Sequence, residues 1–116
     1  MAAQRILIVE DEPLIAMMLE DFLEALGREL VGVADSVADA IAAVEIGGID
    51  AAILDVNLRG GEQSWAVADA LAKAGIPFLL STGAGGDSIA EAYRGRPTLS
   101  KPFTMDAVER ALDALV

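Results

Sequence analysis

The sequence of 116 residues contains no cysteine and no histidine, and aromatic residues make up only 4% of it. Without cysteine, the chain can form no disulfide, zinc–thiolate site or cysteine nucleophile. Without histidine, it cannot use an imidazole for catalysis, haem ligation or metal binding. The hydrophobic fraction is nevertheless 54%, which excludes a disordered chain. The core must therefore be built from alanine, valine, isoleucine and leucine.

Basic residues are also scarce, with 8 lysines and arginines against 19 acidic residues and a net charge of −11. Such a chain repels nucleic acid phosphates and anionic membranes, so we expect neither as a partner. The unbroken apolar runs reach only four to six residues, as in 14–19, whereas a membrane span needs roughly 20. The first residues lack the architecture of a signal peptide. We therefore expect a cytoplasmic protein.

Short apolar runs alternate with segments of helical periodicity along the chain. The run at 6–9 is continuous and branched, which is typical of a strand buried on both faces. Pro13 suits the first turn of the following helix, and Gly27 suits its carboxyl-terminal cap. The predicted strands are 6–9, 30–34, 51–54, 78–81 and 98–100, and the predicted helices are 13–26, 36–46, 65–74, 87–93 and 104–115.

Five strand–helix units predict an α/β fold with a doubly wound, five-stranded parallel sheet in the flavodoxin-like order 2-1-3-4-5. We expect residues 1–116 to form one domain, because no linker or low-complexity segment interrupts the pattern. In such a fold the functional site lies beyond the carboxyl ends of the strands, between the first and third strands.

Polar residues follow four of the predicted strands at this edge. They are Glu10 and Asp11 after the first strand, Asp55 after the third, Ser81 and Thr82 at the end of the fourth, and Lys101 after the fifth. Taken singly, each acid would be a helix cap or a turn residue, and the lysine a solvated surface charge. Their coincidence at one edge favours a functional site.

The charges of this group suggest its chemistry. Two carboxylates about 5 Å apart repel by about 3 kcal/mol at an effective dielectric constant of 20, so three need cations nearby. Lys101 supplies one positive charge, and Mg²⁺ is a hard cation that binds carboxylates together with phosphate oxygens. Asp55 could then act as a nucleophile toward a phosphoryl group, with Thr82 donating a hydrogen bond to it. We expect Mg²⁺ here, with Ca²⁺ or Mn²⁺ as substitutes.

With the motifs at 6–12, 53–58, 80–83 and 101–103, the chain resembles the receiver domain of two-component response regulators. The resemblance implies phosphoryl transfer from a sensor histidine kinase, or from a phosphotransfer protein, to Asp55. It also implies roles for the neighbouring residues. Asp11 would bind the metal directly, Glu10 through water or as an outer ligand, and Asn57 through its backbone carbonyl. Thr82 would be the switch hydroxyl and Lys101 the phosphate-binding lysine. The peptide bond between Lys101 and Pro102 is usually cis in this family.

The segment 77–86 resembles a subgroup of stand-alone receivers that carry a proline-phenylalanine, threonine-glycine, glycine-glycine signature and accompany alphaproteobacterial sensor kinases of the HWE and related types. Leu80 and Ser81 depart from the usual Phe-Ala of that subgroup. Thr98 stands where the wider family has Tyr or Phe, so a switch that flips this aromatic ring cannot operate. Glu10 replaces the commoner Asp.

We therefore expect a single-domain response regulator without an output domain. It would not be an enzyme, and it would signal by protein contact or act as a phosphate sink. We expect a monomer, with a weak dimer as the alternative. Two other interpretations stay open: a pseudo-receiver that only binds partners, and an aspartyl-phosphate phosphatase. The phosphatase needs a second Asp two residues after the nucleophile, where this chain has Asn57.

Two surface features yield further expectations. Leu14, Met17 and Met18 have no obvious place in the apolar stripe of the first helix, so we expect them to form the kinase-docking surface. The glycine-rich segment 82–86 is expected to be the mobile switch, because glycine has the largest backbone freedom.

Overall fold

The computed structural model describes residues 4–56, 58, 63–82, 96–100 and 103–115. These ranges contain the elements β1 (Arg5–Val9), α1 (Pro13–Ala25), β2 (Glu29–Ala34), α2 (Val37–Ile46), β3 (Ala51–Asp55), α3 (Trp65–Lys73), β4 (Phe78–Thr82), β5 (Thr98–Ser100) and α4 (Met105–Asp113). All five predicted strands are confirmed to within one residue, and four of the helices to within two. The helix predicted at 87–93 and the glycine-rich segment after Thr82 lie outside the described residues.

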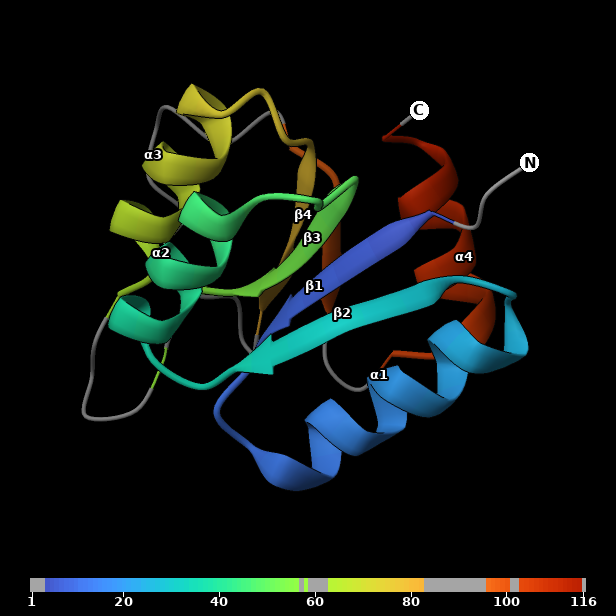
Figure 1. Cartoon of the computed structure of the whole chain (residues 1–116). Helices are drawn as coiled ribbons and strands as arrows, with labels where there is room; N and C mark the ends of the chain where they lie inside the picture. Colours follow the sequence, from blue (N-terminus) through green and yellow to red (C-terminus); the bar gives the residue numbers. More distant parts are fainter. Residues whose placement is uncertain (1–3, 57, 59–62, 83–95, 101–102, 116) are drawn as a thin grey trace.

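The five strands form one parallel sheet in the order β2-β1-β3-β4-β5, which confirms the predicted topology (Figure 1). The β1–β2 pairing is irregular: Ile6 pairs with Leu30, but Leu7 pairs with Gly32, so Val31 is an extra residue in β2. The two edges of the sheet are this bulged strand and the three-residue β5. The order places β1 beside β3 at the centre, where the candidate residues were expected.

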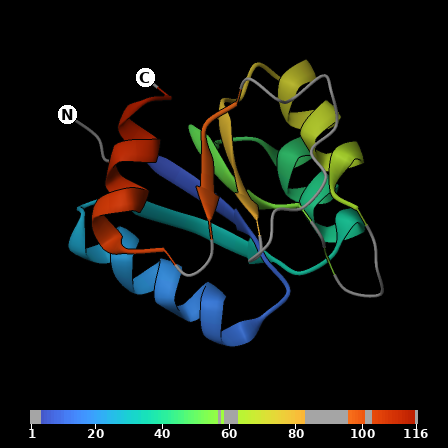
Figure 2. The same cartoon turned by 180° about the vertical axis from the view of Figure 1, so that it is seen from behind.

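The helices cover both faces of the sheet, with α1 and α4 on one side and α2 and α3 on the other (Figures 1 and 2). Because alternate residues of a strand point to opposite faces, each strand contributes to two apolar clusters. Ile53 and Leu79 belong to the cluster under α1 and α4, whereas Leu54 and Leu80 belong to the cluster under α2 and α3. The strands are therefore buried on both faces, as their continuous apolar sequences predicted.

Capping residues fix where the helices begin and end. The hydroxyl of Ser36 accepts a hydrogen bond from the amide of Asp39, and that of Thr104 accepts one from Ala107, each at 3.2 Å. After α1, Gly27 adopts φ +73°, and the amide of Arg28 donates to the carbonyl of Leu23 at 2.9 Å. This arrangement is a Schellman motif, which needs glycine for its left-handed residue. The cap predicted at Gly27 is confirmed.

Helix α1 exposes only part of the expected surface. Leu14 and Met17 are 79% and 55% exposed, but Met18 packs against the cluster under α1 and α4. The prediction that Met18 has no core role is therefore wrong, because the apolar stripe of α1 is wider than its most regular positions suggested. Among the described residues, no helix has the length and apolar character needed to cross a membrane.

Candidate functional site

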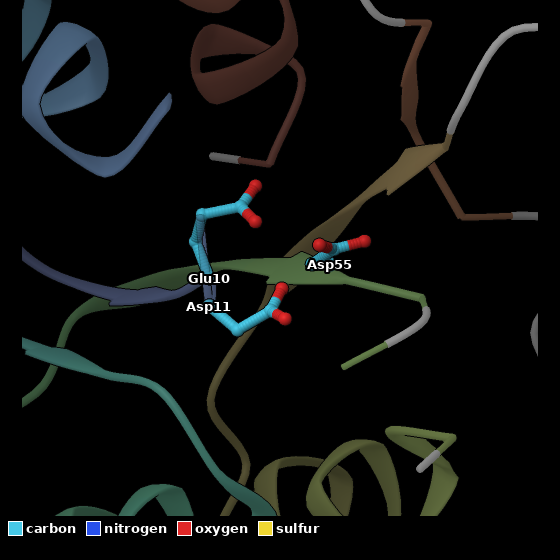
Figure 3. Close-up of side chains that lie close together, drawn as sticks. All are labelled: Glu10, Asp11 and Asp55. Atoms are coloured by element: carbon cyan, nitrogen blue, oxygen red, sulfur yellow. The ribbon is translucent and has the colours of Figure 1, made fainter. Parts of the chain in front are cut away.

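Three carboxylates meet at the carboxyl ends of β1 and β3 (Figure 3). Glu10 and Asp11 follow β1 directly, and Asp55 is the last residue of β3. One carboxylate oxygen from each residue lies within 4.8 Å of the others. Glu10 and Asp55 are buried, with exposed fractions of 2% and 5%, while Asp11 is half-buried. The parallel pairing of β1 with β3 thus brings together residues 44 and 45 positions apart in the chain.

Backbone hydrogen bonds hold Glu10 in place at the end of its strand. Its amide donates to the carbonyl of Ala34 at 3.0 Å, which extends the pairing of β1 with β2 by one residue. Its carboxylate accepts a hydrogen bond from the amide of Glu12 at 3.2 Å. Helix α1 begins at Pro13, so the positive end of its backbone dipole faces the three carboxylates.

The chain beyond Asp55 is fixed by hydrogen bonds to Val56. The amide of Val56 donates to the carbonyl of Ser81 at 3.1 Å, and its carbonyl accepts from both the amide and the hydroxyl of Ser64, each at 3.1 Å. Ser64 is fully buried. Strand β3 therefore stays in register with β4 up to Asp55, and the start of α3 is tied to it.

Two hydroxyl residues end β4 beside Asp55. Thr82 is 7% exposed, and its hydroxyl donates to the carbonyl of Leu99 in β5 at 3.4 Å. Ser81 is 1% exposed and is the direct partner of Asp55 in the β3–β4 register. Within the part of the chain that the structure describes, the Ser81 hydroxyl has no hydrogen-bond partner.

The donor set fits a hard divalent cation. All three residues offer carboxylate oxygens, the ligands that Mg²⁺ and Ca²⁺ prefer, and the spacing of those oxygens would allow one ion to contact all of them. Carboxylates at this spacing repel one another, and a bound cation would offset that repulsion.

The grooves among the described residues lie away from the three carboxylates. Two described grooves, of about 430 and 580 Å³, lie between β2 and α2 and against β5 and α4. Neither is lined by Glu10, Asp11 or Asp55.

The predicted site residues are brought together only in part. Glu10, Asp11, Asp55 and Thr82 gather at adjacent strand ends, as the sequence predicted. Asn57, Lys101 and Pro102 lie outside the described residues, so their predicted roles stay predictions. Thr98, at the position where the wider family was expected to have an aromatic ring, is exposed on the edge strand β5.

Comparison with known families matches residues 6–113 to the response regulator receiver domain. The chain belongs to this family. The receiver is 38% identical over 116 residues to the transcriptional regulatory protein TcrA of Mycobacterium tuberculosis, and 39% identical over 82 residues to the phyllosphere-induced regulator PhyR of Methylorubrum extorquens. These matches cover 96% and 69% of the receiver, but only 45% and 31% of the two relatives. The chain thus spans less than half the length of either.

Solved structures match the receiver over nearly its whole length. The solution structure of SdrG from Sphingomonas melonis Fr1 is 64% identical, with a TM-score of 0.91, and the match covers 99% of the receiver and 98% of SdrG. The BeF3-activated conformation of SdrG, from Pseudomonas melonis Fr1, is 65% identical with a TM-score of 0.84 and the same coverage. The receiver resemblance and the fold predicted from sequence are therefore confirmed.

The burial of two serines, Ser64 and Ser81, was not predicted from the sequence. Ser64 carried no signal, because a serine before a helix is ordinarily an exposed cap. Ser81 was noted at the end of a strand, but its burial and its position opposite Asp55 follow from the β3–β4 register.

Proposed function

We propose that this receiver accepts a phosphoryl group on Asp55 from a sensor histidine kinase, or from a phosphotransfer protein, in a reaction that requires a divalent cation. The observation that supports it most strongly is the position of Asp55. Its carboxylate lies within 4.8 Å of those of Glu10 and Asp11, at the carboxyl edge of the sheet.

The chemistry follows from the residues at this edge. A carboxylate oxygen of Asp55 attacks phosphorus, an O–P bond forms, and the P–N bond to the donor histidine breaks, with its electron pair returning to the imidazole. Burial of Asp55 at 5% exposure limits the access of water to the product. The hydroxyl of Thr82 turns from the carbonyl of Leu99 to a phosphoryl oxygen.

The cation is Mg²⁺ in this proposal, with Ca²⁺ or Mn²⁺ as substitutes. Asp11 and Asp55 would bind it directly, and Glu10 would act through water or as an outer ligand. The resemblance to receivers adds the backbone carbonyl of Asn57 as a further ligand. When bound, it offsets the negative charge of the carboxylates and of the incoming phosphoryl oxygens. Lys101 supplies the remaining positive charge.

The receiver acts as a signalling protein and not as an enzyme. Its output is protein contact or removal of phosphate from the kinase, in the cytoplasm, as a monomer or a weak dimer. The amide side chain of Asn57 supports this proposal, because a phosphatase would carry a second aspartic acid at that position.

Intact-mass spectrometry after treatment with acetyl phosphate and Mg²⁺ tests the proposal. We expect one added phosphoryl group in the wild type and none in Asp55→Ala. Asp50→Asn is the matched control, because Asp50 precedes the same strand at its opposite end, where its carboxylate accepts from the amide of Arg5 at 2.8 Å. Equal labelling of wild type and Asp55→Ala would contradict the assignment.

The same preparation separates the other interpretations. A pseudo-receiver would add no phosphoryl group under any condition. A phosphatase would release phosphate from a phosphomonoester such as p-nitrophenyl phosphate over many turnovers, which we do not expect here.

A further inference from the structure

Ser81 is a buried hydroxyl at the candidate site to which no role has yet been given. It is 1% exposed, and among the described residues its oxygen has no hydrogen-bond partner. Such a hydroxyl has lost its hydrogen bonds to water and gained none from the protein. The folded protein is therefore less stable with serine than with alanine at this position. The matched case is Ser64, also buried, whose hydroxyl donates to the carbonyl of Val56 at 3.1 Å.

The register of the sheet places Ser81 beside Asp55. Ile53 pairs with Leu79, and both pack in the cluster under α1 and α4. Asp55 and Ser81 pair two residues further on, so their side chains leave the same face of the sheet, since successive residues alternate between faces. The Ser81 hydroxyl therefore leaves the sheet on the same face as the Asp55 carboxylate, one of the three carboxylates of the site.

We infer that Ser81 is a positioning residue whose hydroxyl donates a hydrogen bond to the phosphorylated side chain of Asp55. This inference rests on the proposed phosphorylation of Asp55. With acetyl phosphate as donor, the Asp55 O–P bond forms, the P–O bond of acetyl phosphate breaks, and acetate leaves with the electron pair. Ser81 keeps its proton throughout and donates only a hydrogen bond. The acyl phosphate supplies additional charged oxygens, and one of them provides the acceptor that the hydroxyl otherwise lacks.

In this role, Ser81 destabilises the unphosphorylated protein and stabilises the phosphorylated protein. Replacing it with alanine removes an unsatisfied polar group from the unphosphorylated protein, so its melting temperature should stay the same or rise. The same replacement removes a hydrogen bond from the phosphorylated state, which should then be less stable. A serine with a purely structural role would not change the two states in opposite directions.

The experiment measures the affinity for beryllofluoride, a phosphoryl mimic, by fluorine NMR at saturating Mg²⁺. We expect Ser81→Ala to bind it about tenfold more weakly than the wild type, the size expected for one hydrogen bond to a charged group. Ser81→Cys, which is slightly larger and offers only a weak donor, should show a similar loss. Thermal melts without ligand should show no destabilisation of Ser81→Ala.

Ser64→Ala is the control variant. It should melt at a lower temperature, because it loses the bond to Val56, while its beryllofluoride affinity stays at the wild-type value. Equal beryllofluoride affinity in Ser81→Ala and wild type would overturn the inference, as would an equal loss of affinity for Mg²⁺ alone, which would assign the hydroxyl to the metal. Failure of the wild type to bind beryllofluoride would instead refute the proposed function.

Discussion

At the scale of single residues, folding brings three carboxylates of the site closer together than they would be in the unfolded chain. Glu10 and Asp55 are almost fully buried, and their carboxylates lie within 4.8 Å of each other and of Asp11. Such an arrangement lowers the free energy of unfolding until a cation binds. Asp11, being half-buried, can be replaced with the least damage to packing, so it offers the cleanest measurement of this effect.

Removal of Asp11 should separate the effect of repulsion from the effect of metal. We expect Asp11→Ala to be more stable than the wild type without metal by about 1 kcal/mol, because one repelling charge is gone. We expect Mg²⁺ at 100 times its dissociation constant to stabilise the wild type by about 2.7 kcal/mol and to leave Asp11→Ala and Asp55→Ala unaffected. Thermal melts with Mg²⁺ and with a chelator give both quantities.

The control is Asp21→Ala, which removes the same charge from an exposed position on α1. It should retain the full response to Mg²⁺. A wild type whose melting temperature ignores millimolar Mg²⁺ would count against the cation site.

At the scale of elements, α1 serves two surfaces at once. One side packs on the sheet through residues such as Leu19 and Leu23, which are fully buried, while Leu14 and Met17 are exposed near the start of the helix. These two follow Glu10 and Asp11 closely in the chain, so we expect a kinase that delivers a phosphoryl group to Asp55 to contact them.

Serine at Leu14 or Met17 should slow phosphoryl transfer from a sensor histidine kinase that phosphorylates the wild type, by roughly tenfold if the side chain is an anchor of the interface. Labelling by acetyl phosphate, which needs no docking, should not change. The control is Ile46→Ser at the end of α2, because Ile46 is 87% exposed on the opposite side of the sheet. Unchanged transfer in both α1 variants would exclude this surface from docking.

Helix α4 depends on the cap at its start. Thr104 accepts the amide hydrogen of Ala107 at 3.2 Å, so Thr104→Ala should lower the free energy of unfolding by about 1 kcal/mol. Thr104→Ser keeps the acceptor and should change stability by only a few tenths of that. Urea denaturation followed by circular dichroism distinguishes them, and equal midpoints for the two variants would refute the role of the cap.

Helices and strands could be predicted from the sequence because neighbouring residues determine them. Side-chain contacts that depend on how the strands pair could not. The strands were recognisable because each is a short apolar run, and the sheet order followed from their alternation with helices. By contrast, Met18 was misassigned because the width of a buried stripe depends on what packs against it. The burial of Ser81 could not be predicted either, since it depends on the pairing of β4 with β3.

At the scale of the whole molecule, the net charge of −11 acts on every element. Acidic side chains outnumber basic ones on a small surface, and their mutual repulsion opposes the compact state. The described ion pairs join Arg5 to Glu29 at 3.8 Å and Arg28 to Asp113 at 2.8 Å. They connect neighbouring elements but neutralise little of the total.

Screening this repulsion should stabilise the fold. We expect the melting temperature to rise by about 4 °C, or about 1 kcal/mol, between low and moderate ionic strength. Choline chloride is the salt to use, because its bulky cation cannot bind between the three carboxylates. A melting temperature that falls with choline chloride would contradict this account.

The two edges of the sheet bear on how the protein behaves when it is concentrated. An exposed strand with regular, unpaired backbone groups is a template on which a second molecule can add its own strand. A chain that is 54% hydrophobic would be at risk of growing into fibrils that way. Here one edge, β2, is interrupted by the extra residue Val31 and begins at the charged Glu29, and the other, β5, is only three residues long. Neither edge presents a long, regular strand. The bulge in the β1–β2 pairing therefore disfavours the addition of a second molecule to that edge.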